Sequence, residues 1–73
     1  MNRGNISQLH SQEEYGSIRT KDGEDARFNS QCLWNTRFEE LTVGQEVEFE
    51  VQTGRTGLLA FHIRPWASLP AVA

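Results

Sequence analysis

The chain lacks most of the features that stabilise small secreted or membrane proteins. Cys32 is the only cysteine among 73 residues, so an intramolecular disulfide is excluded. No apolar run approaches the ~18 residues that a membrane-spanning helix needs, and the polar N-terminus does not resemble a secretory signal. We therefore expect no membrane partner. A cytoplasmic location is expected, because a single thiol is compatible with a reducing compartment.

Positive charge is also scarce. Lys21 is the only lysine, and ten acidic residues against seven basic ones give a formal net charge of −3. Tight binding to duplex DNA without sequence preference depends on many Lys and Arg contacts to phosphate, so this balance argues against it. Any contacts that the chain makes to phosphate must come mainly from arginine.

Groups that could support catalysis are few. His10 and His62 are the only histidines. They lack the close spacing of a metal site, and no activating cluster is visible near Cys32. No glycine-rich phosphate-binding loop is present. We therefore expect no enzymatic activity, no catalytic residue, no metal and no cofactor.

The residues that are present form short alternating runs of apolar and polar side chains, which is the pattern of β-strands. The clearest run is 46–51, in which valine and phenylalanine alternate with three glutamates. Residues 53–57 turn the chain. A returning strand is predicted over 59–64, in which Leu59, Phe61 and Ile63 alternate with Ala60, His62 and Arg64, and Phe61 and Ile63 enter the core. Pro65 ends this strand, because proline cannot donate to the ladder.

Three further strands are predicted upstream. They cover 4–9, 15–20 and 25–30, and the uneven spacing of apolar residues in the first indicates a β-bulge. Asp22-Gly23 is predicted to form a hairpin turn between the second and third strands. Residues 31–34 are predicted to form one helical turn, followed by a loop anchored by Leu41 and Val43. Residues 1–3 are expected to fray.

Five short strands bury their apolar face best by rolling into a barrel, which also removes sheet edges. The prediction is therefore an all-β, five-stranded antiparallel barrel formed by residues 1–66, with 67–73 as a disordered C-terminal tail. The expected core consists of Ile6, Leu9, Ile18, Ala26, Phe28, Leu33, Val47, Phe49, Val51, Phe61 and Ile63.

Several of these segments are similar to those of one family. They are Tyr15-Gly16-Ser17-Ile18, Gly23-Glu24-Asp25, and the block from Phe38 through Gly44-Gln45 and Phe49-Glu50-Val51 to Gly57. In these segments the chain resembles a cold-shock domain, an oligonucleotide-binding (OB-fold) barrel, without gaps from about Gly4 to Arg64. The resemblance implies binding of single-stranded RNA or DNA on the outer face of the first three strands, where aromatic rings stack on bases.

The chain departs from the family on that outer face. The family's first motif reads roughly Lys-Gly-Phe-Gly-Phe-Ile; this chain keeps a ring at Tyr15 but has Ser17 in place of the second one. The family's second motif reads roughly Val-Phe-Val-His; here Arg27 replaces the exposed aromatic and Asn29 replaces the histidine. In the first strand, where the family usually has Lys-Trp-Phe, the chain has Ser-Gln-Leu. The motifs for binding are therefore degenerate.

The resemblance implies a set of binding residues. Tyr15 and Phe38 would stack on bases, Arg27 and Arg19 would contact backbone or bases, and Asn29 would hydrogen-bond a base edge. The first hypothesis is thus a diverged cold-shock-type module that binds single-stranded RNA or DNA weakly or with altered preference.

Other interpretations remain open. Arg27 could be a solvated side chain paired with a carboxylate, and Phe38 could pack its loop onto the barrel. The alternative function is a protein-interaction or structural module that kept the barrel and lost nucleic acid, with a protein partner instead. The acidic charge, the missing rings and the two tryptophans, Trp34 and Trp66, favour this alternative.

Overall fold

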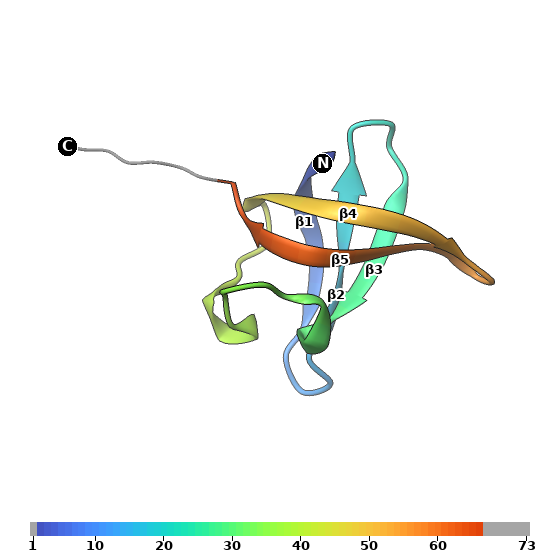
Figure 1. The fold of residues 1–73 in the computed structure, drawn as a ribbon. Helices are drawn as coiled ribbons and strands as arrows, with labels where there is room; N and C mark the ends of the chain where they lie inside the picture. Colours follow the sequence, from blue (N-terminus) through green and yellow to red (C-terminus); the bar gives the residue numbers. More distant parts are fainter. Residues whose placement is uncertain (1, 67–73) are drawn as a thin grey trace.

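The computed structural model describes residues 2–66, which form five strands and two single turns of 3₁₀-helix (Figure 1). In chain order the elements are β1 (Asn2–His10), β2 (Tyr15–Thr20), β3 (Asp25–Asn29), η1 (Ser30–Cys32), η2 (Phe38–Glu40), β4 (Glu46–Gly54) and β5 (Gly57–Pro65). None of the described helices is long or apolar enough to cross a membrane. The predicted tail, 67–73, lies outside the described residues.

The five strands close into a barrel in the order β1-β2-β3-β5-β4, with β4 pairing back onto β1. The prediction of an all-β, five-stranded barrel is therefore confirmed. One pairing differs from the antiparallel expectation: β3 and β5 run parallel and share only two residue pairs, Ala26 with Leu58 and Arg27 with Leu59. Figure 1 shows β4 and β5 crossing the sheet that β1, β2 and β3 form behind them.

Strand β1 begins earlier than predicted. Asn2 and Arg3 pair with Phe49 and Glu48 of β4, so the expectation that these two residues fray is wrong. The predicted bulge is present, because the register of β1 against β2 shifts between Ile6 and Gln8. Ser7 is the extra residue, and it bends β1 so that one strand can pair with both β2 and β4.

Most of the predicted core is buried. Seven of its members are in the buried cluster: Ile6, Ile18, Ala26, Phe28, Val47, Phe49 and Ile63. Three others, Leu9, Leu33 and Val51, pack against the cluster while half-buried. The loop after η1 adds Phe38 and Leu41, whereas Val43 is 63% exposed and does not anchor that loop.

Strand β5 corrects the predicted facing of its side chains. The register against β4 shifts between Glu48 and Glu50, and His62 on the opposite strand has a positive φ of 53°. His62 is thus the extra residue of a second bulge, which reverses the alternation. Ala60 and Ile63 are both fully buried, Leu59 is 43% exposed, and Phe61 is half-buried outside the core cluster.

Gly16 allows β2 to lie close to its neighbours. Its backbone is so near β1 that a Cβ atom would overlap the carbonyl oxygen of Gln8 and press on the ring of Phe28 at 3.0 Å. The first of these contacts is with backbone, so it cannot be relieved by rotating a side chain. Glycine is therefore required at this position because there is no room for a Cβ atom, and not because the backbone adopts a positive φ.

We predict that Gly16→Ala destabilises the barrel by about 1–3 kcal/mol, the usual cost of overpacking a filled site. Urea unfolding would measure the change. Ser17→Ala is the matched control, since residue 17 is half-buried on the outer face and Ser7 Oγ bonds to its backbone carbonyl rather than its side chain. An unchanged urea midpoint for Gly16→Ala would show that β1 and β2 can move apart without loss of stability.

Candidate nucleic-acid interface

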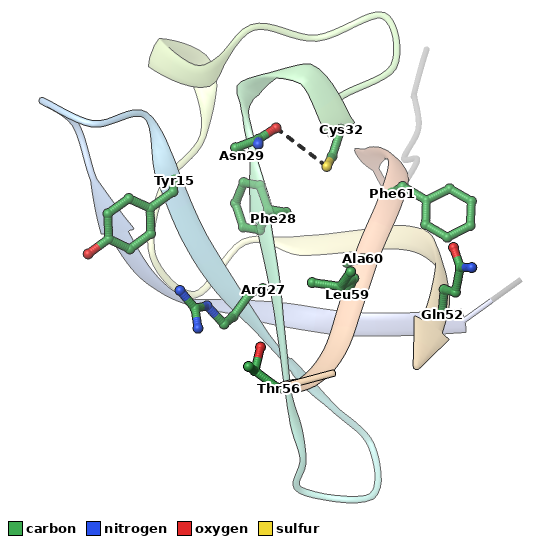
Figure 2. Close-up of a pocket in the computed structure, with 10 residues that line it drawn as sticks. All are labelled: Tyr15, Arg27, Phe28, Asn29, Cys32, Gln52, Thr56, Leu59, Ala60 and Phe61. Atoms are coloured by element: carbon green, nitrogen blue, oxygen red, sulfur yellow. Dashed lines mark hydrogen bonds between the residues drawn. The ribbon is translucent and has the colours of Figure 1, made fainter. Parts of the chain in front are cut away.

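The outer face of β2 and β3 brings three of the predicted residues together. Tyr15 lies opposite Asn29, and Ser17 lies opposite Arg27, in the antiparallel register of the two strands. Alternation along each strand turns these four side chains outward while Ile18 and Phe28 enter the core. Tyr15, Arg27 and Asn29 line one side of an open cavity of about 540 Å³ (Figure 2).

Tyr15 is half of a cross-strand ring pair. Its ring is 36% exposed and stacks on the imidazole of His10, with centroids 4.4 Å apart and an angle of 21° between the planes. The register of β1 and β2 places the two residues opposite each other. His10 therefore supports one face of the tyrosine ring. No role for His10 in this site was predicted from the sequence, although its position directly before the turn that joins β1 and β2 is the signal for the pairing.

Arg27 differs from most arginines in this chain. Arg3, Arg19, Arg37 and Arg64 each form an ion pair with a glutamate or aspartate. Within residues 2–66, the side chain of Arg27 makes no ion pair and no hydrogen bond, so the alternative of a carboxylate-paired side chain is not seen. Its guanidinium extends toward Tyr15 in Figure 2.

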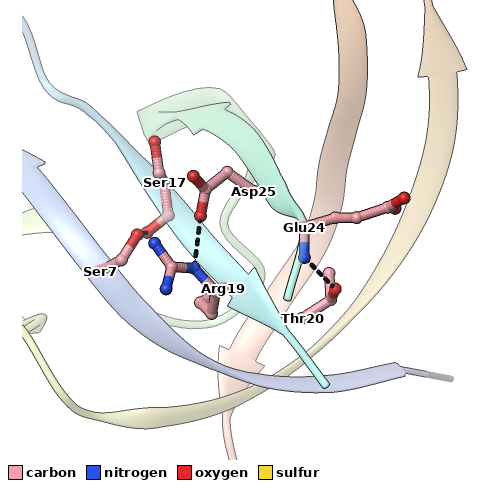
Figure 3. Close-up of polar contacts among 6 residues, drawn as sticks. All are labelled: Ser7, Ser17, Arg19, Thr20, Glu24 and Asp25. Atoms are coloured by element: carbon pink, nitrogen blue, oxygen red, sulfur yellow. Dashed lines mark hydrogen bonds and ion pairs between the residues drawn. The ribbon is translucent and has the colours of Figure 1, made fainter. Parts of the chain in front are cut away.

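Arg19 lies farther along the same face and is already paired. Its Nε donates to Asp25 Oδ1 at 2.9 Å, and the two residues face each other across β2 and β3 (Figure 3). This hydrogen bond, reinforced by the charge of Asp25, raises the pKa of the Arg19 guanidinium above its ordinary value. Much of the positive charge of Arg19 is thus balanced locally before any ligand arrives.

Asn29 combines a structural contact with a free donor group. Its Oδ1 accepts the backbone N–H of Gln31 at 2.9 Å and caps η1, and it also lies 3.5 Å from Cys32 Sγ. The carbonyl end of the amide is therefore occupied, and the Nδ2 end remains as a hydrogen-bond donor.

Phe38 does not lie on this face. It begins η2 and is only 7% exposed, with its ring 6.2 Å from the ring of Phe28. The loop-packing alternative is what the structure contains, and the expected stacking role of Phe38 does not fit this conformation. For a chain with so few core residues, burying the Phe38 ring stabilises the fold more than leaving the ring exposed to stack on a base would.

Among residues 2–66, the half of the surface toward β1 carries no ring besides the His10–Tyr15 pair. The outward residues there are Ser7, Gln8 and Ser17, and Ser7 Oγ already donates to the carbonyl of Ser17 at 3.3 Å (Figure 3). Nearby, the Thr20 hydroxyl accepts the backbone N–H of Glu24 and closes the hairpin. This area is polar and internally bonded.

The opposite wall of the cavity comes from β5, a strand on which the sequence predicted no binding residue. Leu59 and Phe61 line it, together with Gln52 of β4 and Thr56 of the turn. Both apolar residues face outward because of the bulge at His62. The sequence carried no clear signal for this, since strict alternation from Ile63 predicts the reverse facing.

Two of the three glutamates of β4 pair with arginines, and the third faces a histidine. Glu46 pairs with Arg3 at 3.7 Å, Glu48 with Arg64 at 2.8 Å, and Glu50 with His62 Nδ1 at 3.6 Å when that ring is protonated. The face carrying Arg27 is therefore less opposed by negative charge than the net charge suggests.

Both tryptophans lie away from this cavity. Trp34 is 46% exposed, with the Arg64 guanidinium 5.0 Å from its ring centroid and the His62 ring at 5.8 Å. Trp66 is 40% exposed and packs under the guanidinium of Arg3 at 4.2 Å. The indoles are thus held by cation–π contacts on other parts of the surface.

Comparison with known proteins agrees with this architecture. The family described as 'Cold-shock' DNA-binding domain matches residues 2–66. A cold shock-like protein of Thermotoga maritima is 34% identical over 62 residues, which is 85% of this chain and 94% of that protein. The cold shock protein CspB of Geobacillus stearothermophilus is 30% identical over 63 residues, covering 86% and 96% of the two chains. A barrel of this topology and a match over nearly the whole chain lead to one conclusion: the chain belongs to the cold-shock domain family, whose members bind nucleic acid.

Proposed function

We propose that this protein binds single-stranded RNA or DNA through the outer face of β2 and β3, more weakly than a cold-shock domain with a full set of rings. Tyr15 stacks on a base, Arg27 contacts phosphate or stacks, and Asn29 donates a hydrogen bond from Nδ2 to a base carbonyl. Arg19 contributes less to binding, because its guanidinium already forms an ion pair with Asp25.

The observation that carries this proposal is the placement of Arg27. An arginine without an acidic partner among the described residues lies beside an exposed tyrosine at the edge of an open cavity. Guanidinium groups contact phosphate and stack on bases, and sequence-tolerant binding of single strands combines positive charge with aromatic stacking.

The reduced affinity follows from the rings that are missing. Outward positions that carry aromatics in the family hold Ser17, Arg27 and Asn29 here. Each base stacked on a ring contributes roughly 1–3 kcal/mol, so the loss of about three rings weakens binding by several kcal/mol, a factor of hundreds or more.

A titration tests this function directly. We expect that adding a pyrimidine-rich single strand of about eight nucleotides at low salt shifts the NMR amide signals of Tyr15, Arg27 and Asn29, and that the shifts weaken as salt is added. The signal of Val43, which is exposed elsewhere, provides the internal control. Absence of any localised shift at millimolar oligonucleotide would refute binding on this face.

The two arginines provide a second, matched test. We predict that Arg27→Gln lowers affinity and reduces the slope of log K against log salt by about 0.7, the value for one phosphate contact on a single strand. Arg19→Gln should change both quantities less, since Asp25 already balances that charge. Equal effects of the two substitutions, measured by fluorescence anisotropy over a salt series, would contradict the role given to Arg27.

The second candidate function is a protein-interaction module, and the exposed Trp34 with its His62 and Arg64 neighbours favours it. Substituting one ring at a time shows whether the surface around Tyr15 or the surface around Trp34 contacts the oligonucleotide. Under the proposed function, Tyr15→Ala lowers oligonucleotide affinity by about 5- to 150-fold and Trp34→Ala leaves it unchanged. If Trp34→Ala lowered oligonucleotide affinity and Tyr15→Ala did not, the binding surface would be the one around Trp34 and not the outer face of β2 and β3.

A further inference from the structure

The cavity beside Tyr15 lies where two strands of the barrel separate. Strands β3 and β5 share only the pairs Ala26–Leu58 and Arg27–Leu59, and no pair joins them beyond that point in the described residues. The inward side chains of the next residues, Phe28 and Ala60, and the half-buried Cys32 therefore become its floor. This cavity is a gap in the ladder with an apolar bottom.

The register shows what borders the gap. One outward row crosses the barrel as Ser17, Arg27, Leu59 and Gln52, each paired with the next. The neighbouring row runs from His10 to Tyr15 and Asn29, and resumes beyond the gap at Phe61, which pairs with Glu50. The cavity thus occupies the missing position between Asn29 and Phe61, with Leu59 beside it. In Figure 2 Leu59 projects from β5 toward β3, whereas the ring of Phe61, which also lines the cavity, extends from the opposite side of β5.

The chemistry of the lining favours a nucleotide. An apolar floor and the apolar side chains of the β5 wall suit the face of a base, while Arg27, Asn29, Gln52 and Thr56 provide polar groups at the rim. Although the chain has ten acidic residues, the lining contains neither aspartate nor glutamate. An anionic strand with planar bases is complementary to this combination of apolar surface and unpaired positive charge.

We propose that the cavity between β3 and β5 is a base-binding subsite, in which Leu59 and Phe61 contact a base whose phosphate lies near Arg27. The path of the single strand therefore runs from Tyr15 across β3 onto β5, rather than from β2 toward β1. On the outward surface of β1, the ring of His10 is already stacked on Tyr15, and Ser7 and Gln8 carry no ring, whereas β5 offers two apolar side chains. This inference rests on the proposed function and adds the direction of the strand to it.

Ring-current shifts provide a direct test. A base packed against Leu59 moves the NMR signals of its methyl groups upfield, because those methyls then lie over an aromatic face. We expect this shift with a short pyrimidine-rich single strand and its loss with an otherwise identical strand of abasic nucleotides, which retains the phosphates. The methyl signals of Val43, an exposed aliphatic residue remote from the cavity, should not move.

Substitutions test the contribution to affinity. Leu59→Ser and Phe61→Ala should both weaken binding, the second by about 5- to 150-fold if Phe61 stacks on the base. Phe61→Leu keeps most of the packing but removes the ring, so it serves as a variant that preserves the fold. Ser17→Ala, on the side toward β1, and Val43→Ser are the controls, and both should retain the affinity of the unsubstituted protein.

The outcomes separate the two levels of the proposal. Shifts at Tyr15 and Arg27 with no movement of Leu59, or full affinity in Leu59→Ser and Phe61→Leu, would refute the β5 path while leaving binding on β2 and β3 intact. Sedimentation of the unsubstituted protein and of these variants adds a further outcome. If the variants keep full affinity for the oligonucleotide, and the unsubstituted protein self-associates while the variants do not, the apolar side chains of β5 would be assigned to a protein contact. Absence of any shift at Tyr15, Arg27 and Leu59 would remove both proposals.

Discussion

Closure of a small barrel from only five strands is the constraint on which the rest of this structure depends. The strands must bend and change partner, and extra residues at Ser7 in β1 and His62 in β5 provide the change of register. Each bulge shifts the alternation of inward and outward side chains by one residue. The closure of the barrel therefore also decides which residues form its surface.

The same constraint produces the cavity. Closure leaves the β3–β5 pairing only two residues long, and the gap beyond it forms a cavity that the buried residues Phe28 and Ala60 line. A cold-shock domain usually presents rings on its first three strands. This chain has lost most of them there, yet the bulge at His62 places Leu59 and Phe61 on the outside of the neighbouring strand. Apolar side chains therefore border the cavity on β5, whereas the outward positions 17, 27 and 29 on β2 and β3 hold polar residues.

Charge is distributed in a way that the net value conceals. Glu46 and Glu48 of β4 pair with Arg3 and Arg64, and Arg19 is matched by Asp25, so much of the charge on those strands is balanced locally. Arg27, in the centre of the outward row, has no such partner among the described residues. An acidic protein can therefore still offer one site where an anion is favoured, provided that its carboxylates are used elsewhere.

The sequence by itself determined the strands, the first bulge and most of the core, because period-2 alternation, Asp-Gly turns and the uneven spacing of Ile6 and Leu9 are local signals. It also placed Tyr15, Arg27 and Asn29 on one face, since adjacent strands of a hairpin share their register. Only the tertiary structure decided the burial of Phe38, the stacking of His10 on Tyr15 and the outward facing of Leu59 and Phe61. These depend on how distant segments meet: a loop closes over the core, two strand ends align, and a bulge in β5 accommodates the curvature of β4. No residue type in the sequence encodes such a fit, because it is a property of the closed barrel.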